Sequence, residues 1–271
     1  MNDNTVAFIG AGNMARCVIA AMVKAGYPAQ HIIAANRSQP MLTALADDYG
    51  IRTTLNNIEA VEQADVIVLA VKPQMMQQVS EALVAGAPEI ADKLFVTLAA
   101  GIEVSRYQQW LGKIRIVRAM PNTPALLAQG VTGLFASGCS NYECAFVDHM
   151  FSGTGMTVWL QQEEQINHII AVTGSAPAYF FYFMQAMQQV AEQLGFEPEQ
   201  AKAMVAKTAL GAASMALQGE HSFAELRAQV TSKGGTTHEA VTTFERLGLE
   251  KMVADAMYAA IARAQDMAKT F

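Results

Sequence analysis

The chain has 271 residues, of which 52% are hydrophobic and 15% are charged, and its formal net charge is −6. This length allows one large domain or two smaller ones, and the composition provides a large core and excludes extended disorder. The acidic balance argues against nucleic acid or an anionic membrane surface as the main partner.

The start of the chain and its cysteines indicate the compartment. The first residues, MNDNTVAFIGAG, lack the basic segment that opens a signal peptide, so we expect a cytoplasmic protein. The cysteines Cys17, Cys139 and Cys144 have no metal-ligand spacing. We therefore expect reduced thiols and no bound metal.

The first part of the chain alternates short apolar runs with segments of helical spacing, such as 14–25 and 39–49. The apolar runs predict strands at 6–9, 31–35, 65–71, 94–98, 114–119, 131–136 and 156–160. Alternation of this kind predicts an α/β fold with a parallel sheet and right-handed crossovers. The last two runs are expected to extend that sheet.

From Glu163 onward the pattern is helical throughout. Helical spacing covers 163–194, 198–218, 222–229, 236–247 and 249–270, and the first of these helices is interrupted at 173–177. We therefore expect an α/β domain over 1–162 and an all-helical domain over 163–271. A helical domain so rich in Ala, Met and Phe is expected to bury apolar surface against a partner subunit.

The first predicted strand ends in a glycine-rich turn that opens a helix. Gly10 permits the tight turn, Gly12 lets the backbone approach a pyrophosphate, and Ala15 lets the helix pack on the strand. The free N–H groups of the helix then face the phosphates. The pattern predicts a dinucleotide site at Gly10, Ala11, Gly12, Asn13, Met14 and Ala15, and the alternative is an ordinary strand–helix turn.

The residues at the end of the second predicted strand indicate whether the site suits NADP or NAD. NAD sites usually carry Asp or Glu at this place for the ribose 2′-hydroxyl. This chain has Asn36, Arg37 and Ser38 instead, and these Arg and Ser side chains can bind a 2′-phosphate. NADP(H) is the predicted cofactor, with NAD(H) as the alternative. The competing interpretation of Arg37 is a solvated loop residue without a cofactor contact.

Two more loops follow predicted strands at the edge where open α/β sheets bind ligands. The residues predicted to contact the cofactor there are Ala70, Val71, Lys72, Pro73, Ala99, Ala100 and Gly101. The small residues of the second loop would let a nicotinamide lie against the backbone. Lys72 either meets the phosphates or ribose or caps a loop in water, and the sequence favours neither.

Short segments along the whole chain resemble the pyrroline-5-carboxylate reductase family. They are FIGAGNMA, AVKP, LAAGI, RAMPNTPA, TGSAPAY and SKGGTT, and the most specific stretches are RAMPNTP and VTSKGGTTHEA. Members of this family reduce a cyclic imine carboxylate in the last step of proline biosynthesis. The resemblance implies a Rossmann-like NADP(H)-binding domain and a helical substrate domain that forms homodimers, in some members assembled into rings.

The resemblance also implies the substrate residues. Gly234 and Gly235 would let the backbone approach the substrate carboxylate at the start of the helix predicted from Thr236. Thr236 and Thr237 would contact the substrate, and Thr237 would be the catalytic donor to the imine nitrogen. The alternative is a helix N-cap after a glycine turn. Lys233 replaces the proline that the family usually has, and its role is open.

A further group of positions completes the predicted site. Ser175 lies within the helix interruption at 173–177, which is expected to leave it and nearby backbone groups unpaired as a wall of the substrate site. By the resemblance, Glu220 would lie near the substrate and Asn57 near the cofactor. Met120 and Asn122 belong to the MPNTP loop, which either faces the nicotinamide or is a rigid structural turn.

Two other functions remain open from the sequence. A β-hydroxyacid dehydrogenase has a similar layout and uses a lysine of its helical domain. Lys202 and Lys207 are available, but neither lies in a matching motif. A non-catalytic NADP(H)-binding sensor would not need the second glycine-bearing polar site.

Overall fold

The structure is a computed structural model that describes residues 4–269. The described residues form two compact units. The first unit holds those up to Ser175 together with those from Ala260 onward, and the second is Ala176–Ala259. The domain boundary expected near residue 162 stays a prediction.

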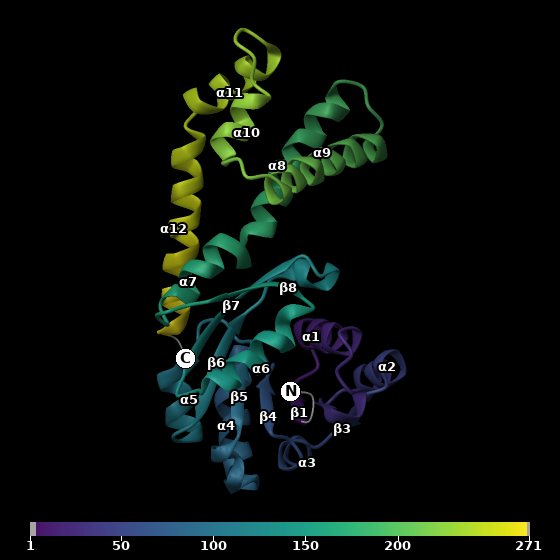
Figure 1. Ribbon diagram of the computed structural model, residues 1–271, viewed down its shortest axis with the longest axis vertical. Coiled ribbons are helices and arrows are strands. Elements are labelled where there is room, and N and C mark those ends of the chain that lie inside the picture. The colour runs from purple at the N-terminus through teal and green to yellow at the C-terminus, as the bar shows by residue number, and fades with distance from the viewer. Residues whose placement is uncertain (1–3, 270–271) are drawn as a thin grey trace. The chain divides into compact units, whose positions relative to one another are not determined.

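The first unit is built on an eight-stranded sheet, as counted over the described residues. Its strands are β1 (Val6–Ile9), β2 (Ile32–Ala35), β3 (Arg52–Thr54), β4 (Val66–Leu69), β5 (Leu94–Thr97), β6 (Arg115–Met120), β7 (Gly130–Ser137) and β8 (Gly155–Trp159). Their order is β3-β2-β1-β4-β5-β6-β7-β8 (Figure 1). The order reverses between β1 and β4, and in open α/β sheets such a point forms the ligand crevice.

Helices cover both faces of this sheet. They are α1 (Asn13–Lys24), α2 (Gln39–Tyr49), α3 (Asn57–Glu62), α4 (Pro73–Gly86), α5 (Val104–Leu111), α6 (Asn141–Ser152) and α7 (Gln165–Ile169). Along β1, Val6 and Phe8 belong to one buried cluster, and Ala7 and Ile9 belong to the other. This burial on both faces accounts for the nearly continuous apolar runs of the strands. The predicted α/β class is confirmed.

The last two strands extend the sheet as expected, but they run opposite to the first six. β7 pairs antiparallel with β6, and β8 pairs parallel with β7. The connection between β6 and β7 contains only the short 3₁₀ helix Thr123–Leu127. Parallel neighbours need a crossover of a dozen residues or more, so this short connection forces the chain to reverse.

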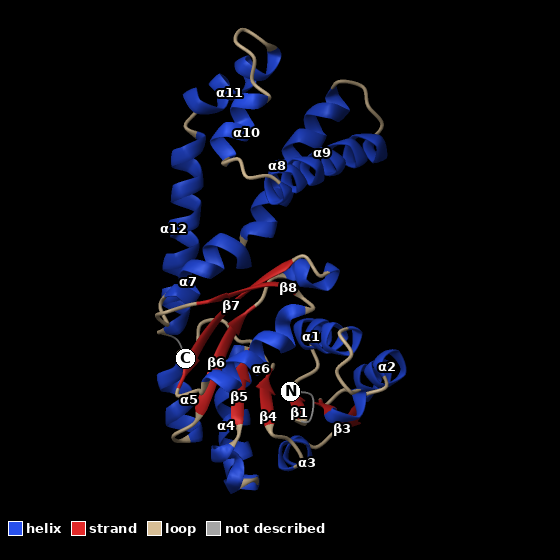
Figure 2. Cartoon of the chain, viewed as in Figure 1, coloured by secondary structure: helices blue, strands red, loops and turns tan. Residues whose placement is uncertain are grey.

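The second unit is helical throughout its described residues (Figure 2). It contains α8 (Ala176–Gln193), α9 (Pro198–Gln218), α10 (Phe223–Gln229), α11 (Thr236–Arg246) and the start of α12 (Leu249–Ala268). α8 packs along α9, and the rings of Phe183 and Phe244 lie 5.9 Å apart and join α8 to α11. Arg227 and Glu245 form an ion pair of 3.4 Å between α10 and α11.

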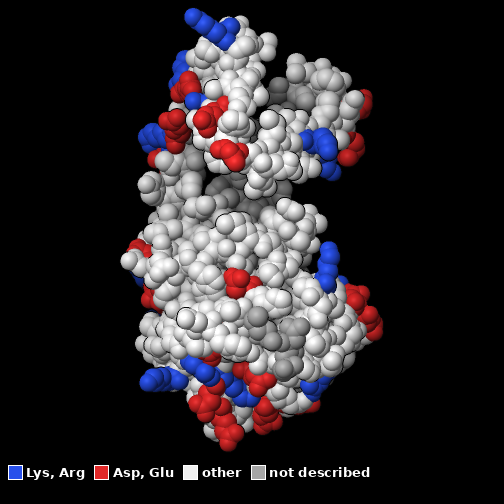
Figure 3. Space-filling view, in the orientation of Figure 1, with Lys and Arg blue, Asp and Glu red and all other residues white. Residues whose placement is uncertain are grey.

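Large apolar side chains remain exposed on this second unit. On α8, Phe180, Phe181 and Tyr182 are 67%, 64% and 76% exposed. Exposed apolar surface of this extent marks an interaction site, so a partner chain is expected to cover α8. Acidic and basic side chains lie interspersed on the face that Figure 3 shows. Within residues 4–269, no helix is long and apolar enough to cross a bilayer.

Candidate active site

The carboxyl end of β1 carries the predicted dinucleotide turn. Gly10 has a φ of +99°, and a Cβ there would lie 2.8 Å from the carbonyl oxygen of Ala70, so only glycine fits. A Cβ on Gly12 would meet no heavy atom of the described chain within 4 Å, so the backbone is open to a ligand at this point. Ala15 is buried, as close packing of helix and strand requires.

Backbone hydrogen bonds connect this turn to the neighbouring strand ends. The N–H of Gly10 donates to the carbonyl of Ala35 at 2.8 Å, and the N–H of Ala70 donates to the carbonyl of Ile9 at 2.9 Å. Gly12 is the N-cap of α1, and among the described residues no side chain caps this helix. Its first N–H groups are therefore available to an anion.

The loop after β2 holds the predicted 2′-phosphate residues. The Oδ1 atom of Asn36 accepts from the N–H of Arg37 at 2.9 Å, and the Arg37 side chain is exposed. Ser38 is the N-cap of α2 but makes no side-chain cap bond. Asn57 begins α3, whose cap is the side chain of Asn56, which accepts from Ile58 N–H at 2.9 Å. The side chain of Asn57 is thus not needed for the cap.

The loops after β4 and β5 lie side by side, because these strands pair in parallel. In the first loop, Lys72 is exposed and is the N-cap of α4, and Pro73 is the first helical residue. In the second loop, Gly101 has a φ of +75°. The N–H of Ala99 donates to Thr97 Oγ1 at 3.3 Å, so the side chain of Thr97 holds the first residue of this loop.

A buried polar cluster supports the second loop further. Thr97 Oγ1 lies 2.5 Å from the hydroxyl of Tyr107, and burial raises the pKa of this tyrosine well above its usual range. Glu163 Oε1 accepts from the N–H of Val104 at 2.7 Å and from Arg118 Nη1 at 2.6 Å. Arg118 lies on β6 and is buried. Glu163 therefore ties the start of α5, which follows the 99–101 loop, to β6.

Sequence reasoning missed this cluster. Arg118 interrupts the apolar run predicted over 114–119, and an arginine in a buried strand usually indicates a charged partner. Its partner Glu163 lies 45 residues away along the chain, beyond the reach of any local pattern.

Asn122 follows β6 and is buried. Its Oδ1 accepts from the N–H of Val131 at 2.9 Å, and its Nδ2 donates to the carbonyl of Thr173 at 3.0 Å. Met120 is half-buried, and its Cε lies 3.3 Å from the position that a Cβ on Gly174 would take. The structure thus brings the MPNTP loop against the segment that precedes Ser175. The cofactor contacts expected of Met120 and Asn122 stay predictions.

Ser175 follows a π-helical turn, Ile170–Gly174, that joins α7 to α8. The N–H of Ser175 donates to the carbonyl of Ile170 at 2.7 Å, and Thr173 Oγ1 donates to the carbonyl of Ile169 at 3.0 Å. The expectation that the interruption leaves backbone groups unpaired was wrong for the N–H of Ser175. The helix widens over Ile170–Gly174 instead of breaking, and the wider turn still pairs the amide of Ser175.

In the second unit, four predicted substrate residues lie together at the start of α11. Gly234 has a φ of +72°, and Gly235 is the N-cap. The N–H of Gly235 donates to the carbonyl of Ser232 at 3.0 Å. Thr236 and Thr237 are exposed in the first turn, and among the described residues no side chain caps this helix. Its free N–H groups and two hydroxyls suit a carboxylate.

The remaining substrate residue and the unusual lysine are also exposed. Glu220 lies in the connection between α9 and α10. Lys233 directly precedes Gly234 and adds a cation beside the start of α11. Over the described residues there is no group of three or more His, Cys, Asp and Glu side chains that could hold a metal ion.

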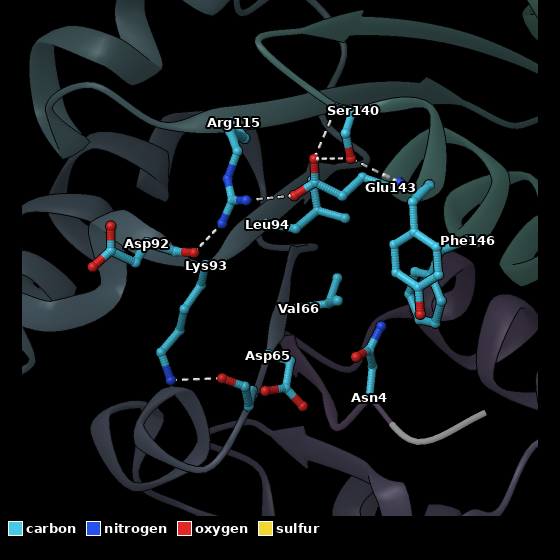
Figure 4. Close-up of a pocket in the computed structure, with 12 residues that line it drawn as sticks. Asn4, Asp65, Val66, Asp92, Lys93, Leu94, Arg115, Ser140, Glu143 and Phe146 are labelled. Carbon is cyan, nitrogen blue, oxygen red and sulfur yellow. Dashed lines mark hydrogen bonds and ion pairs between the residues drawn. The ribbon is translucent and has the colours of Figure 1, made fainter. Parts of the chain in front are cut away.

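A cavity of about 400 Å³ lies at the opposite edge of the sheet, at the amino ends of β1, β4, β5 and β6 (Figure 4). Its cations are already paired within the protein. Lys93 Nζ donates to the carbonyls of Val61 and Ala64, both at 2.6 Å, and Arg115 pairs with Glu143 at 2.8 Å. None of the predicted site residues lines this cavity, so we assign it a structural role.

Two family profiles match the chain. Residues 163–267 match the profile described as pyrroline-5-carboxylate reductase dimerisation, and residues 5–101 match the profile described as NADP oxidoreductase coenzyme F420-dependent. The two profiles together cover the helical part and the dinucleotide turn.

Named relatives are similar over the full length. The pyrroline-5-carboxylate reductase of Vibrio alginolyticus is 47% identical, with 100% of each chain covered. That of Pseudomonas aeruginosa is 44% identical, covering 99% of this chain and 98% of the relative. The solved structure of a pyrroline-5-carboxylate reductase from Coxiella burnetii is 40% identical, with a TM-score of 0.92 over 98% of this chain and 99% of that one.

Proposed function

The chain belongs to the pyrroline-5-carboxylate reductase family, and we propose that it reduces 1-pyrroline-5-carboxylate to L-proline with NADPH, the last step of proline biosynthesis. The observation that carries this proposal is the similarity to named reductases, which extends over both the turn after β1 and the helix start at α11. The balanced reaction consumes one NADPH and one proton for each imine that is reduced.

The first unit provides the features that a dinucleotide requires. Gly10 allows the tight turn against Ala70, Gly12 leaves the backbone open to the pyrophosphate, and the uncapped start of α1 supplies N–H donors. Arg37 and Ser38 would hold a 2′-phosphate, which favours NADPH over NADH. When bound, NADPH supplies the hydride that adds to the imine carbon. The loops 70–73 and 99–101, with Asn57 and Met120, would complete the cofactor site.

The start of α11 would hold the substrate. The N–H groups of the first turn of α11, which follows Gly234 and Gly235, would bind the carboxylate, and Thr236 would orient it. Thr237 would donate a hydrogen bond to the imine nitrogen and pass it a proton from water, because a hydroxyl alone is a weak acid at neutral pH. The substrate contacts predicted for Ser175 and for Glu220 are part of this proposal. If the substrate arrives as an iminium ion, Thr237 only orients it.

The family profile over 163–267 indicates oligomerisation. The exposed aromatic side chains of α8 support a homodimer formed through the helical segment, which would cover Phe180, Phe181 and Tyr182. Assembly of such dimers into larger rings is part of the proposal, as is a cytoplasmic location. The partner molecules would thus be the imine, NADPH and a second copy of the chain.

A substrate comparison tests the proposal. The purified protein is mixed with NADPH and 1-pyrroline-5-carboxylate, and separately with NADP⁺ and a β-hydroxy acid, and the change in NADPH absorbance is followed. Loss of NADPH with the imine, and no gain with the hydroxy acid, supports the reductase. The reverse pattern supports a β-hydroxyacid dehydrogenase. Tight NADPH binding without either reaction supports a sensor.

A further inference from the structure

Asn122 joins two segments that both belong to the predicted site. Its side-chain amide makes two hydrogen bonds. Oδ1 accepts from Val131 N–H at 2.9 Å, and Nδ2 donates to the carbonyl of Thr173 at 3.0 Å. The residue is 7% exposed, so neither bond competes with much bulk water. The amide thus fixes the loop after β6 to the turn before Ser175.

The turn that receives this bond is the π-helical segment Ile170–Gly174. A π turn leaves carbonyl groups out of the ordinary helix ladder, and such turns often occur at functional sites. Here Thr173 is tied twice, since its hydroxyl donates to Ile169 and its carbonyl accepts from Asn122. The wide turn is therefore held by side chains as well as by its own backbone.

Two glycines allow the close packing on which this arrangement depends. A Cβ on Gly133 of β7 would lie 2.8 Å from Ile169 Cγ2, and a Cβ on Gly174 would lie 3.3 Å from Met120 Cε. The end of α7 therefore packs directly on β7, and Gly174 of the π turn packs against the last residue of β6. In this packed setting, the Asn122 amide sets the position of the Thr173 carbonyl, two residues before Ser175.

We propose that Asn122 is a positioning residue of the reductase, which places Ser175 for the substrate by holding the π turn through the carbonyl of Thr173. This inference rests on the proposed function, because Ser175 is assigned to the substrate there. It differs from a direct contact between Asn122 and the cofactor. The two possibilities predict different effects on NADPH affinity.

The test substitutes Asn122→Asp. The variant keeps an oxygen that can accept from Val131 N–H, but it places a second acceptor opposite the carbonyl of Thr173. We expect turnover of the imine to fall about tenfold, the usual size of a lost buried hydrogen bond, while NADPH affinity measured by fluorescence titration changes less than about twofold. A large loss of NADPH affinity would overturn the inference.

A double-mutant cycle with Ser175→Ala tests whether Asn122 acts through Ser175. If it does, Asn122→Asp lowers turnover of the Ser175→Ala enzyme much less than it lowers turnover of the parent, because the two residues act as a unit. Equal effects in both backgrounds would contradict the proposal. Thr157→Val is the matched control, since it removes one side-chain hydrogen bond, 2.7 Å to Asp148, between β8 and α6. The control is expected to keep parental turnover.

Amide hydrogen exchange at Ser175 tests the structural role of Asn122 independently of the reductase activity. In Asn122→Asp the amide of Ser175 is expected to exchange about tenfold faster than in the parent, and in Thr157→Val it is expected to stay protected. This readout does not depend on turnover, so it holds even if the parent fails to reduce the imine. Unchanged protection of Ser175 in Asn122→Asp would show that Asn122 does not hold the turn.

Discussion

Gly10 and Gly26 form a matched pair for testing the dinucleotide turn. Both have positive φ, +99° and +87°, where an L side chain is strained. They differ in their surroundings: a Cβ on Gly10 would lie 2.8 Å from the carbonyl oxygen of Ala70, and a Cβ on Gly26 would meet no heavy atom of the described chain within 4 Å. Alanine at Gly26 therefore adds backbone strain alone, and alanine at Gly10 adds strain and a collision.

The two costs can be estimated separately. The positive φ costs alanine about 1–2 kcal/mol at either position. The contact at Gly10 is 2.8 Å, against 3.4 Å or more for ordinary contacts, and its partner is backbone that cannot rotate away. Overpacking of this kind costs about 1–3 kcal/mol more. We therefore expect Gly10→Ala to lose about 2–5 kcal/mol of unfolding free energy, and Gly26→Ala to lose about 1–2 kcal/mol.

Urea unfolding at one fixed protein concentration measures the stability of both variants, and NADPH fluorescence titration measures cofactor affinity. Because the collision displaces Ala70 within the predicted cofactor site, Gly10→Ala is expected to bind NADPH at least about tenfold more weakly, while Gly26→Ala binds like the parent. If both variants lose equal stability and keep equal affinity, the close approach of Gly10 to Ala70 does not shape the cofactor site.

Three further outcomes are expected. Arg37→Ala raises the KM for NADPH about tenfold and leaves that for NADH unchanged, and equal changes for both cofactors would refute the 2′-phosphate contact. Glu163→Ala leaves the buried Arg118 unpaired and lowers the unfolding free energy, measured in urea, by about 3 kcal/mol. Glu163→Gln is expected to lose less unfolding free energy, because the glutamine oxygen still accepts from the N–H of Val104. Equal losses in the two variants would contradict the role of the Glu163 charge. Burial, with smaller contributions from Cys144 and Glu143, raises the pKa of Cys139 to about 11. Only about 0.3% of this thiol is ionised at pH 8.5, so iodoacetamide should label it about a hundredfold more slowly than an unperturbed cysteine, as peptide mass spectrometry would show.

Strong local patterns predicted most elements of the fold. Helices α2 and α9 begin and end at the predicted residues, because Gln39–Tyr49 and Pro198–Gln218 combine helical spacing with a proline in the first turn. β3 escaped prediction because Arg52–Thr54 is a three-residue edge strand without apolar residues. The reversal at β7 was also missed, since apolar runs do not encode strand direction.

The glycine turn after β1 was the most predictable part of the candidate site, because a strand followed by Gly10, Gly12 and a helix is a local motif. The roles of Asn122 and Glu163 were not predictable, since their partners are 51 and 45 residues away. A sequence cannot tell whether a buried amide binds a ligand or the protein itself. The interruption before Ser175 was recognised, but a glycine in a helix does not say whether the helix breaks or widens.

Reductase activity is tested by NADPH oxidation on addition of 1-pyrroline-5-carboxylate, measured for the parent, Thr237→Ala and Thr242→Ala. Thr242 is an exposed threonine on the same helix, so its variant controls for loss of a surface hydroxyl. We expect fast turnover in the parent and in Thr242→Ala, and a kcat about a hundredfold lower in Thr237→Ala. Fast turnover in all three would reduce Thr237 to a residue that orients an iminium substrate. A parent protein that binds NADPH but does not oxidise it in the presence of the imine would contradict the account.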